Sequence, residues 1–253
     1  MRLTFLGTGT SKGIPEIGCT CPTCLSTNPR DKRLRVSVLI ETKETRILID
    51  CGPDFRMQML NIPFGRIDGV LLTHEHYDHT GGIDDLRPFG IFGDINVFAD
   101  ELTHSHLRER LPYFFREVLY PGVPRLLFHS VQPYSPFSIK GVEIIPLQVM
   151  HGKLPILGFR IGKLGFMTDM TDAPEETIKR LIGVDTLVIG ALRKHPHATH
   201  QTINEAIEVA LRVKAKETYL IHMNHEAGLH AETDAQLPKH VHLAYDGLKI
   251  EIE

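Results

Sequence analysis

Short apolar runs of strand length recur along the whole chain, and they restrict it to a fold built on β-sheets. The runs are RLTFLGTG, VSVLIET, TRILIDCG, GVLLTH, INVFAD, VEIIPLQVM, LGFRIG, LGFMTDM, TLVIGAL, ETYLIHM and VHLAYDGLKIEIE. Each is rich in Val, Ile, Leu, Phe or Thr and is bounded by Gly, Pro, Asp or Asn, which form turns. We therefore expect about ten strands.

Helical spacing is clearest in two segments between these runs. In PEETIKRLIG we expect Asp172 as the N-cap and Pro174 in the first turn. The segment INEAIEVALRVKA places four apolar residues on one predicted stripe, namely Ile203, Ile207, Ala210 and Leu211. Residues 100–120 are expected to be helical with a break at Pro112. Helices spread between strands predict a layered α/β (α+β) protein with mixed sheets.

Composition narrows the class of protein and of partner. The 253 residues are 42% hydrophobic and 23% charged, which is typical of a globular protein. Lys+Arg number 28 against 31 Asp+Glu, so the net charge of −3 argues against nucleic acid as a partner. No apolar run approaches the ~18–20 residues that span a bilayer, and the N-terminal run is too short for a signal peptide. We expect one domain over residues 1–253, a cytoplasmic location and no membrane partner.

Potential metal ligands gather at the ends of predicted strands. The run GVLLTH leads directly into an H-x-H-x-D-H cluster made of His74, His76, Asp78 and His79. Imidazole nitrogen and carboxylate oxygen suit zinc, manganese or iron. Three later polar residues also close apolar runs, namely His151, Asp169 and His222. Each of these alone is more typical of a surface residue, but together with the cluster they predict a metal site at one sheet edge.

The cysteines form a second group. Cys19, Cys21 and Cys24 fall within six residues, and in a reducing cytosol such a cluster more often binds metal than forms disulfides. A closed zinc site needs a fourth ligand, and three Cys with one His is a common set. A redox role is the alternative. Cys51 stands apart and is expected to be a buried small apolar residue.

The H-x-H-x-D-H motif with a later His, Asp and His resembles the signature of the metallo-β-lactamase superfamily. The likeness continues through LTFLGTGTSKGIPEIGCTCPTC, HGKL, the Thr168-Asp169 pair, HMNH and the closing YDGLKI. With these segments the chain resembles the PhnP-type cyclic phosphodiesterases of the carbon–phosphorus lyase pathway, which are related to the tRNA 3′-processing endonucleases. The resemblance implies an αββα four-layer sandwich with two mixed β-sheets.

The resemblance also implies roles for these residues. His74, His76 and His151 would hold one divalent ion, Asp78, His79 and His222 a second, and Asp169 would bridge the two, which would be manganese or zinc. Asp50 would orient a ligand histidine through its other ring nitrogen; a turn residue at a strand end is the alternative. His225 would complete a structural zinc site with the three cysteines.

The chemistry implied is hydrolysis of a small phosphodiester. Two cations would share a hydroxide that attacks phosphorus and would neutralise the charge that grows on its oxygens. His200 matches the family's general acid, which would protonate the leaving alkoxide, while His195 and His197 are expected to be loop residues. A cyclic ribose phosphate is the substrate that the resemblance implies, and it also implies a homodimer.

Other functions stay open at this point. They are tRNA 3′-end maturation, thioester or lactam hydrolysis by the same scaffold, and binding without turnover. The tRNA hypothesis lacks a long Gly- and basic-rich insert, and binding alone would be favoured by a missing ligand, yet none is missing. Arg33 and Arg35 form a small basic group that we expect at a solvated strand entrance, with a contact to substrate phosphate as the alternative.

Overall fold

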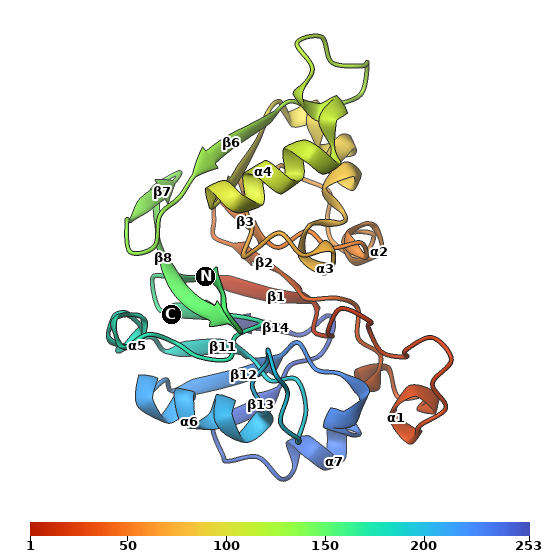
Figure 1. The fold of residues 1–253 in the computed structure, drawn as a ribbon, viewed down its shortest axis with the longest axis vertical. Helices are drawn as coiled ribbons and strands as arrows, with labels where there is room; N and C mark the ends of the chain where they lie inside the picture. The colour runs from red at the N-terminus through yellow and green to blue at the C-terminus, as the bar shows by residue number, and fades with distance from the viewer.

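The computed structural model describes residues 1–253 and contains two seven-stranded sheets (Figure 1). The first sheet has the order β14 (Lys249–Glu251), β1 (Arg2–Gly7), β2 (Ser37–Glu41), β3 (Arg46–Ile49), β4 (Gly69–Leu71), β5 (Ile95–Ala99), β6 (Leu126–Ser130). The second has the order β13 (Val241–Leu243), β12 (Glu217–Ile221), β11 (Thr186–Gly190), β10 (Leu164–Met167), β9 (Leu154–Ile161), β8 (Val142–His151), β7 (Phe137–Ile139). Both sheets are mixed, because β14 to β3 and β7 to β10 pair antiparallel while the remaining neighbours pair parallel.

Helices cover the outer face of each sheet. They are α1 (Pro22–Leu25), α2 (Phe55–Met59), α3 (Tyr77–Thr80), α4 (Glu101–Arg110), α5 (Glu175–Leu181), α6 (Ile203–Val213) and α7 (His230–Asp234). Four 3₁₀ helices connect them, namely η1 (Pro29–Asp31), η2 (Ile83–Phe92), η3 (Pro112–Phe115) and η4 (His225–Ala227). Figure 1 shows α2 to α4 on one side of the two sheets and α5 to α7 on the other.

Three apolar clusters hold these layers together. Between the sheets, Phe5 and Ile49 of the first meet Phe159 and Phe166 of the second, and none of these four side chains is exposed. A second cluster packs α2, η2 and α4 on the first sheet, and a third packs α5 and α6 on the second. Burial of apolar surface on both faces of both sheets explains the near-continuous Val, Ile and Leu runs. The αββα sandwich with two mixed sheets is therefore confirmed.

The number of strands and the last apolar run were predicted wrongly. The structure has strands at Leu126–Ser130 and Phe137–Ile139 that lie outside every predicted run. They lie at the edges of the two sheets and are partly exposed, so they lack a continuous apolar signal. The run VHLAYDGLKIEIE makes two strands in different sheets, because the chain turns at Gly247 with φ of 89° and then pairs with β1.

The helices agree in position but differ in detail. α6 begins at a capping box of Thr202 and Glu205. Its buried stripe consists of Ile203, Ala206, Val209, Ala210 and Val213. Leu211, expected on that stripe, is 71% exposed because it lies one residue beyond the buried face. Pro174 rather than Asp172 is the N-cap of α5, with no capping side chain. The predicted break holds, since α4 ends at Arg110 and η3 begins at Pro112.

Strand ends from both sheets meet at one edge of the sandwich and there carry the polar residues. Asp50 follows β3, and His74 follows β4 by three residues. From the other sheet, His151 ends β8, Asp169 follows β10 and His222 follows β12. None of the helices is both long and apolar enough to cross a bilayer.

Candidate metal centre

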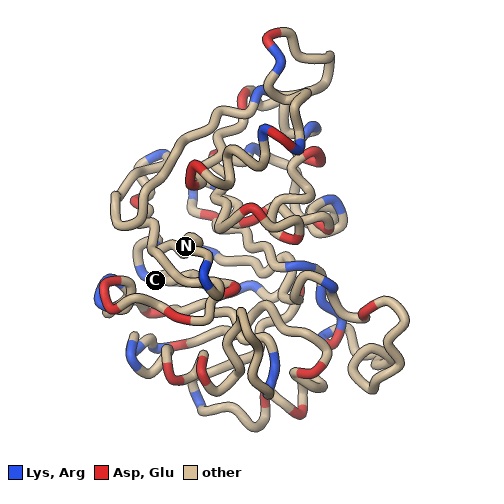
Figure 2. The backbone as a smooth tube through the Cα atoms, in the orientation of Figure 1, with Lys and Arg blue, Asp and Glu red and all other residues tan.

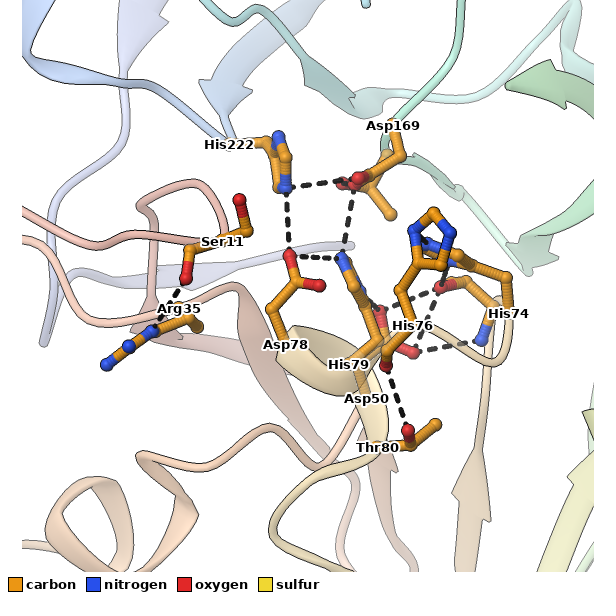
Figure 3. Close-up of polar contacts among 12 residues, drawn as sticks. Ser11, Arg35, Asp50, His74, His76, Asp78, His79, Thr80, Asp169 and His222 are labelled. Carbon is orange, nitrogen blue, oxygen red and sulfur yellow. Dashed lines mark hydrogen bonds and ion pairs between the residues drawn. The ribbon is translucent and has the colours of Figure 1, made fainter. Parts of the chain in front are cut away.

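Three of the polar residues at this edge have a left-handed backbone. The φ angles of Asp50, Asp169 and His222 are 60°, 53° and 59°. Such values are uncommon outside glycine and are concentrated at functional sites, where the surrounding structure holds them. Asp50 and His222 directly follow β3 and β12, and Asp169 comes two residues after the end of β10. At each position the turn ends the strand and directs the side chain toward the polar residues of the site (Figure 3). The fold therefore maintains local strain to assemble this edge.

His74, His76 and His151 form the first donor cluster. One donor atom from each lies within 4.8 Å of the others. His74 Nε2 is 3.0 Å from His76 Nδ1, and the ring centres of His76 and His151 are 5.2 Å apart. His74 is buried, whereas His76 is exposed. Solvent and small molecules thus reach this cluster from the His76 side.

Asp78, His79, Asp169 and His222 form the second donor cluster, shown in Figure 3. His79 Nε2 lies 3.2 Å from Asp78 Oδ2 and 3.3 Å from Asp169 Oδ1. His222 Nε2 lies 3.1 Å from Asp169 Oδ2. Asp169 belongs to a further donor group with His151, so its carboxylate lies between the two clusters.

Two of these histidines are oriented by an acceptor on the opposite side of the ring. The fully buried Asp50 accepts a 2.7 Å hydrogen bond from His79 Nδ1 through Oδ2, while its Oδ1 accepts from the Thr73 amide at 2.9 Å. The Thr199 carbonyl accepts a 2.8 Å hydrogen bond from His151 Nδ1. Both bonds keep a proton on Nδ1 and direct Nε2 at the donor clusters, so Nε2 is the nitrogen that a cation would take. Asp50 thus lies behind His79, one of the histidines predicted to be metal ligands.

Unpaired buried nitrogens show that these residues fit a cation. His79 Nε2 and both ring nitrogens of His222 are buried without a hydrogen-bond partner. A buried polar atom without a partner costs about 1–3 kcal/mol, and here several such atoms face carboxylates. Imidazole nitrogens with carboxylate oxygens are a donor set for zinc or manganese. Divalent ions would satisfy these atoms together.

The charges at the site also favour a cation. Burial lowers the pKa of His79, but Asp169, Asp78 and Asp50 together outweigh it and raise that pKa well above its usual value. Burial opposes ionisation of Asp78, yet the charge of His79 together with hydrogen bonds from His222 and His79 outweighs it and lowers the pKa of this carboxyl. Burial, followed by the charge of His79, holds the pKa of His74 well below normal, so this ring is neutral. Ionised carboxylates with a neutral imidazole are the ligand states that metals require.

His200 lies beside both clusters at the base of a cavity. Its ring centre is 4.8 Å from that of His151 and 5.0 Å from that of His222, and its Nδ1 is 3.9 Å from Asp169 Oδ2. Its side chain is 15% exposed and lines a cavity of about 350 Å³. Burial, with the charge of His222 next, lowers the pKa of His200 to about 3. Leu192 is the one hydrophobic residue among the 11 that line this cavity.

The three cysteines meet His225, as expected for a zinc site. His225 Nδ1 lies 3.4 Å from Cys19 Sγ and 3.2 Å from Cys21 Sγ, and the donor atoms of all three cysteines and His225 lie within 4.8 Å of one another. Burial raises the pKa of Cys21, but hydrogen bonds from the Cys24 amide and His225 outweigh it and lower the pKa to about 6. Three thiolates and one imidazole fit a tetrahedral zinc ion. Cys51 is fully buried in an apolar cluster, as predicted.

The basic pair near residue 34 was predicted wrongly. Arg33 is 4% exposed and donates to Thr8 Oγ1 and the Ala244 carbonyl rather than to solvent. Arg35 pairs with Asp54 at 2.9 Å. The partners of Arg33 include a carbonyl more than two hundred residues away, so no local pattern could have indicated its burial. Thr73 and Thr199 were also missed, because a hydroxyl or a backbone carbonyl gives no sequence signal as a ligand support.

Sequence comparisons agree with this geometry. A family profile described as a beta-lactamase superfamily domain matches residues 45–223. A Porphyromonas gingivalis protein named octanoyltransferase is 46% identical over 100% of this chain, which covers 52% of that protein. A ribonuclease Z of Bacteroides thetaiotaomicron is 24% identical over 54% of this chain and 44% of its own. The chain thus spans about half the length of these curated relatives, and the name of the first applies to a protein with much chain outside the match.

Solved structures place the chain more narrowly. The structure of the human short-form tRNase Z matches with a TM-score of 0.73 at 20% identity, and the match covers 100% of both chains. It shares the fold. A structure described as a new diphosphatase from the PhnP family has a TM-score of 0.92 at 38% identity, and the match covers 100% of this chain and 98% of that one. The chain therefore belongs to the metallo-β-lactamase superfamily and, within it, to the PhnP family.

Proposed function

We propose that this protein is a binuclear metal-dependent hydrolase that cleaves a small phosphodiester, with His200 as the general acid. The superfamily and the two donor clusters support a metal-dependent hydrolase. The observation that carries the proposal is that both clusters meet at the single carboxylate of Asp169, with His200 beside it. The similar structure described as a PhnP-family diphosphatase supports a phosphorus–oxygen bond as the target.

The residues of the chain would divide the work as follows. His74, His76 and His151 would hold one cation, Asp78, His79 and His222 the other, and Asp169 both. When bound, the cations supply Lewis acidity toward the phosphate oxygens and the attacking water. Asp50 and the Thr199 carbonyl keep His79 and His151 in the tautomer that leaves Nε2 free.

His200 would supply the proton that an alkoxide leaving group needs. In the free protein its imidazole is neutral at pH 7, because burial lowers its pKa to about 3. A dianionic transition state bound against the ring would favour the imidazolium and so raise this pKa. A positioned general acid contributes ~10²–10⁴-fold to the rate. The proton would pass from the ring to the leaving oxygen as the phosphorus–oxygen bond breaks.

The cavity and the charge distribution favour a small substrate over a polymer. The cavity beside His200 measures about 350 Å³, and it is lined by polar side chains such as Ser11, Lys12, Arg193 and Asn224. Its lining includes histidine, arginine and uncharged polar side chains but no Phe, Tyr or Trp, so its surface suits a polar, anionic substrate. Acidic and basic residues are interspersed along the chain in Figure 2 rather than gathered on a basic face. A cyclic ribose phosphate or a similar polar diester fits these features better than tRNA.

A turnover assay on metal-analysed protein tests the proposal. The substrates are bis(p-nitrophenyl) phosphate, 2′,3′-cyclic nucleotides, cyclic ribose phosphates and an acyl thioester, each with Mn²⁺ and with Zn²⁺. We expect cleavage of the small diesters and its loss in His76→Ala. If the fully metal-loaded protein cleaves the thioester but none of the diesters, the proposal is wrong and the protein is an acyl hydrolase.

A further inference from the structure

The segment that carries His200 has no backbone support of its own. Residues 194–200 lie between β11 and α6 and make no backbone–backbone hydrogen bond. The bonds that fix the chain on either side come just outside it, from Leu192 to Gln201, Gln201 to Met170 and Ile203 to Arg193. Side chains must therefore hold the segment, or His200 would not keep one position beside the donor clusters.

Arg193 braces the first half of this segment. Its Nε donates to the His195 carbonyl at 3.1 Å and its Nη2 donates to the Pro196 carbonyl at 2.9 Å. The second half is held by the Thr199 carbonyl, which accepts from His151. His197 lies over His200 with the ring centres 5.1 Å apart. The guanidinium is thus the one group that ties residues 195 and 196 to a fixed point.

That fixed point is Glu226 on η4. Arg193 Nη1 forms an ion pair with Glu226, and Asn224 Nδ2 donates to the same carboxylate at 3.2 Å. Asn224 Oδ1 in turn caps η4 by accepting from the Glu226 amide at 2.9 Å. The same short segment contains His222 of the donor cluster and His225 of the cysteine cluster. The Arg193–Glu226 ion pair therefore fixes residues 195 and 196 to the segment that connects the two candidate metal sites.

We propose that Arg193, held by Glu226, is a positioning residue that fixes the His200 imidazole at the leaving group. The inference rests on the proposed function, in which His200 is the acid. A planar guanidinium holds two carbonyls and one carboxylate at once, which an ammonium group at this position would not reproduce. Removal of the guanidinium frees the segment while both donor clusters keep their residues.

The leaving group distinguishes this role from general stabilisation. A p-nitrophenolate leaves without a proton, whereas the alkoxide of a 2′,3′-cyclic nucleotide needs one. We expect Arg193→Met to lower kcat for the cyclic nucleotide by about 10–100-fold, a part of the general-acid contribution, with no comparable loss for bis(p-nitrophenyl) phosphate. Glu226→Gln keeps an acceptor for Arg193 and should retain most of the activity. Glu175→Gln, which alters an exposed pair with Arg212, is the matched control and should change neither rate.

A readout without turnover follows from the same geometry. Cleavage by a lysine-specific protease after the exposed Lys194 reports the freedom of the segment, and it should be faster in Arg193→Met than in the wild type. Metal content is measured in parallel, and we expect it to be unchanged. Unaltered cleavage, or equal loss of kcat on both substrates, would overturn the positioning role.

His200→Ala separates failure of this inference from failure of the proposed function. If His200→Ala selectively loses activity on the cyclic nucleotide but Arg193→Met does not, the positioning role of Arg193 is wrong and the general-acid role of His200 is retained. If His200→Ala affects both substrates equally, the acid assignment itself is wrong.

Discussion

At the scale of single residues, the donor atoms depend on groups that do not themselves face a cation. Asp50 is fully buried, has a left-handed backbone and accepts hydrogen bonds from both His79 and Thr73. Asparagine tolerates the same φ but has one acceptor oxygen where the carboxylate has two. In Asp50→Asn an amide NH₂ must therefore face either the His79 Nδ1 proton or the Thr73 donors.

We predict that Asp50→Asn lowers the affinity for a catalytic cation by ~10–100-fold, as for other residues that orient metal ligands. Calorimetric titration of metal-free protein with Zn²⁺ or Mn²⁺ measures this directly. Asp94→Asn, at an exposed carboxylate, is the control and should bind as the wild type does. Unchanged affinity in Asp50→Asn would leave Asp50 as a turn residue only.

The cysteine cluster yields a second prediction for a single residue. Cys21→Ser removes one thiolate from the group that surrounds His225. We expect the variant to lose one zinc per chain and to unfold at lower temperature, since structural zinc contributes to folding free energy. Metal analysis with calorimetric melting checks both effects. Retention of the zinc in the variant would contradict Cys21 as a ligand, and a wild type without zinc at this cluster would favour the redox role.

The sequence predicted which residues are candidate metal donors more reliably than it predicted which charged residues are buried. The seven residues of the two donor clusters, Asp169 among them, follow from their types and from their places at or just after strand ends. Arg33 does not, because a charged side chain in a basic stretch indicates solvent unless its distant partners are known.

At the scale of elements, α6 shows how far periodicity can be trusted. The predicted stripe was right at Ile203 and Ala210, but one position at the C-terminal end was wrong, since Val213 rather than Leu211 is buried. Leu211 and Val213 lie on opposite sides of the stripe that contains Ile203 and Ala210, so apolar composition alone does not choose between them. Packing against the second sheet decides between them.

Substitutions at these two positions test the observed register. Val213→Ala removes two methyl groups from a fully buried site and should cost about 1–3 kcal/mol of unfolding free energy. Leu211→Lys should change that free energy by less than about 0.5 kcal/mol, because the side chain is already in solvent. Urea denaturation of both variants measures the difference. The reverse order of the two effects would contradict the register.

Strand pairing was beyond prediction for a related reason. Apolar composition marks β13 and β14 as strands, but which sheet each joins depends on partners far away in the chain. β14 pairs with β1 and so brings the two ends of the described chain together.

At the scale of the whole molecule, a buried polar network joins these distant segments. Asp246 accepts from Thr8 Oγ1 at 2.7 Å and from the Leu34 amide at 2.6 Å, with the charge of Arg33 nearby. Burial raises the pKa of Asp246 to about 6, although these donors and Arg33 oppose it. The ionised form of this carboxyl is therefore disfavoured in the folded state.

A pH dependence follows from the sign of this shift. Because the folded pKa lies above the unfolded value of about 3.9, the stabilisation is fully present below about pH 4 and is lost as the pH rises through about 6. Between pH 5 and pH 7 the wild type should lose about 1.3 kcal/mol more unfolding free energy than Asp246→Asn. Denaturant titrations at the two pH values measure the unfolding free energy of both proteins. An equal loss of that free energy in the wild type and in Asp246→Asn would contradict the account of Asp246.

The central claim is that turnover of a phosphodiester depends on cations held by the two clusters around Asp169. The most direct test is a titration of metal-free protein with Mn²⁺ or Zn²⁺, with bound metal per chain and bis(p-nitrophenyl) phosphate hydrolysis followed together. The account predicts that hydrolysis is absent without cation, appears as the catalytic sites fill and stays absent in His76→Ala. Hydrolysis by the metal-free chain, or filled sites without hydrolysis of any small diester, would contradict it.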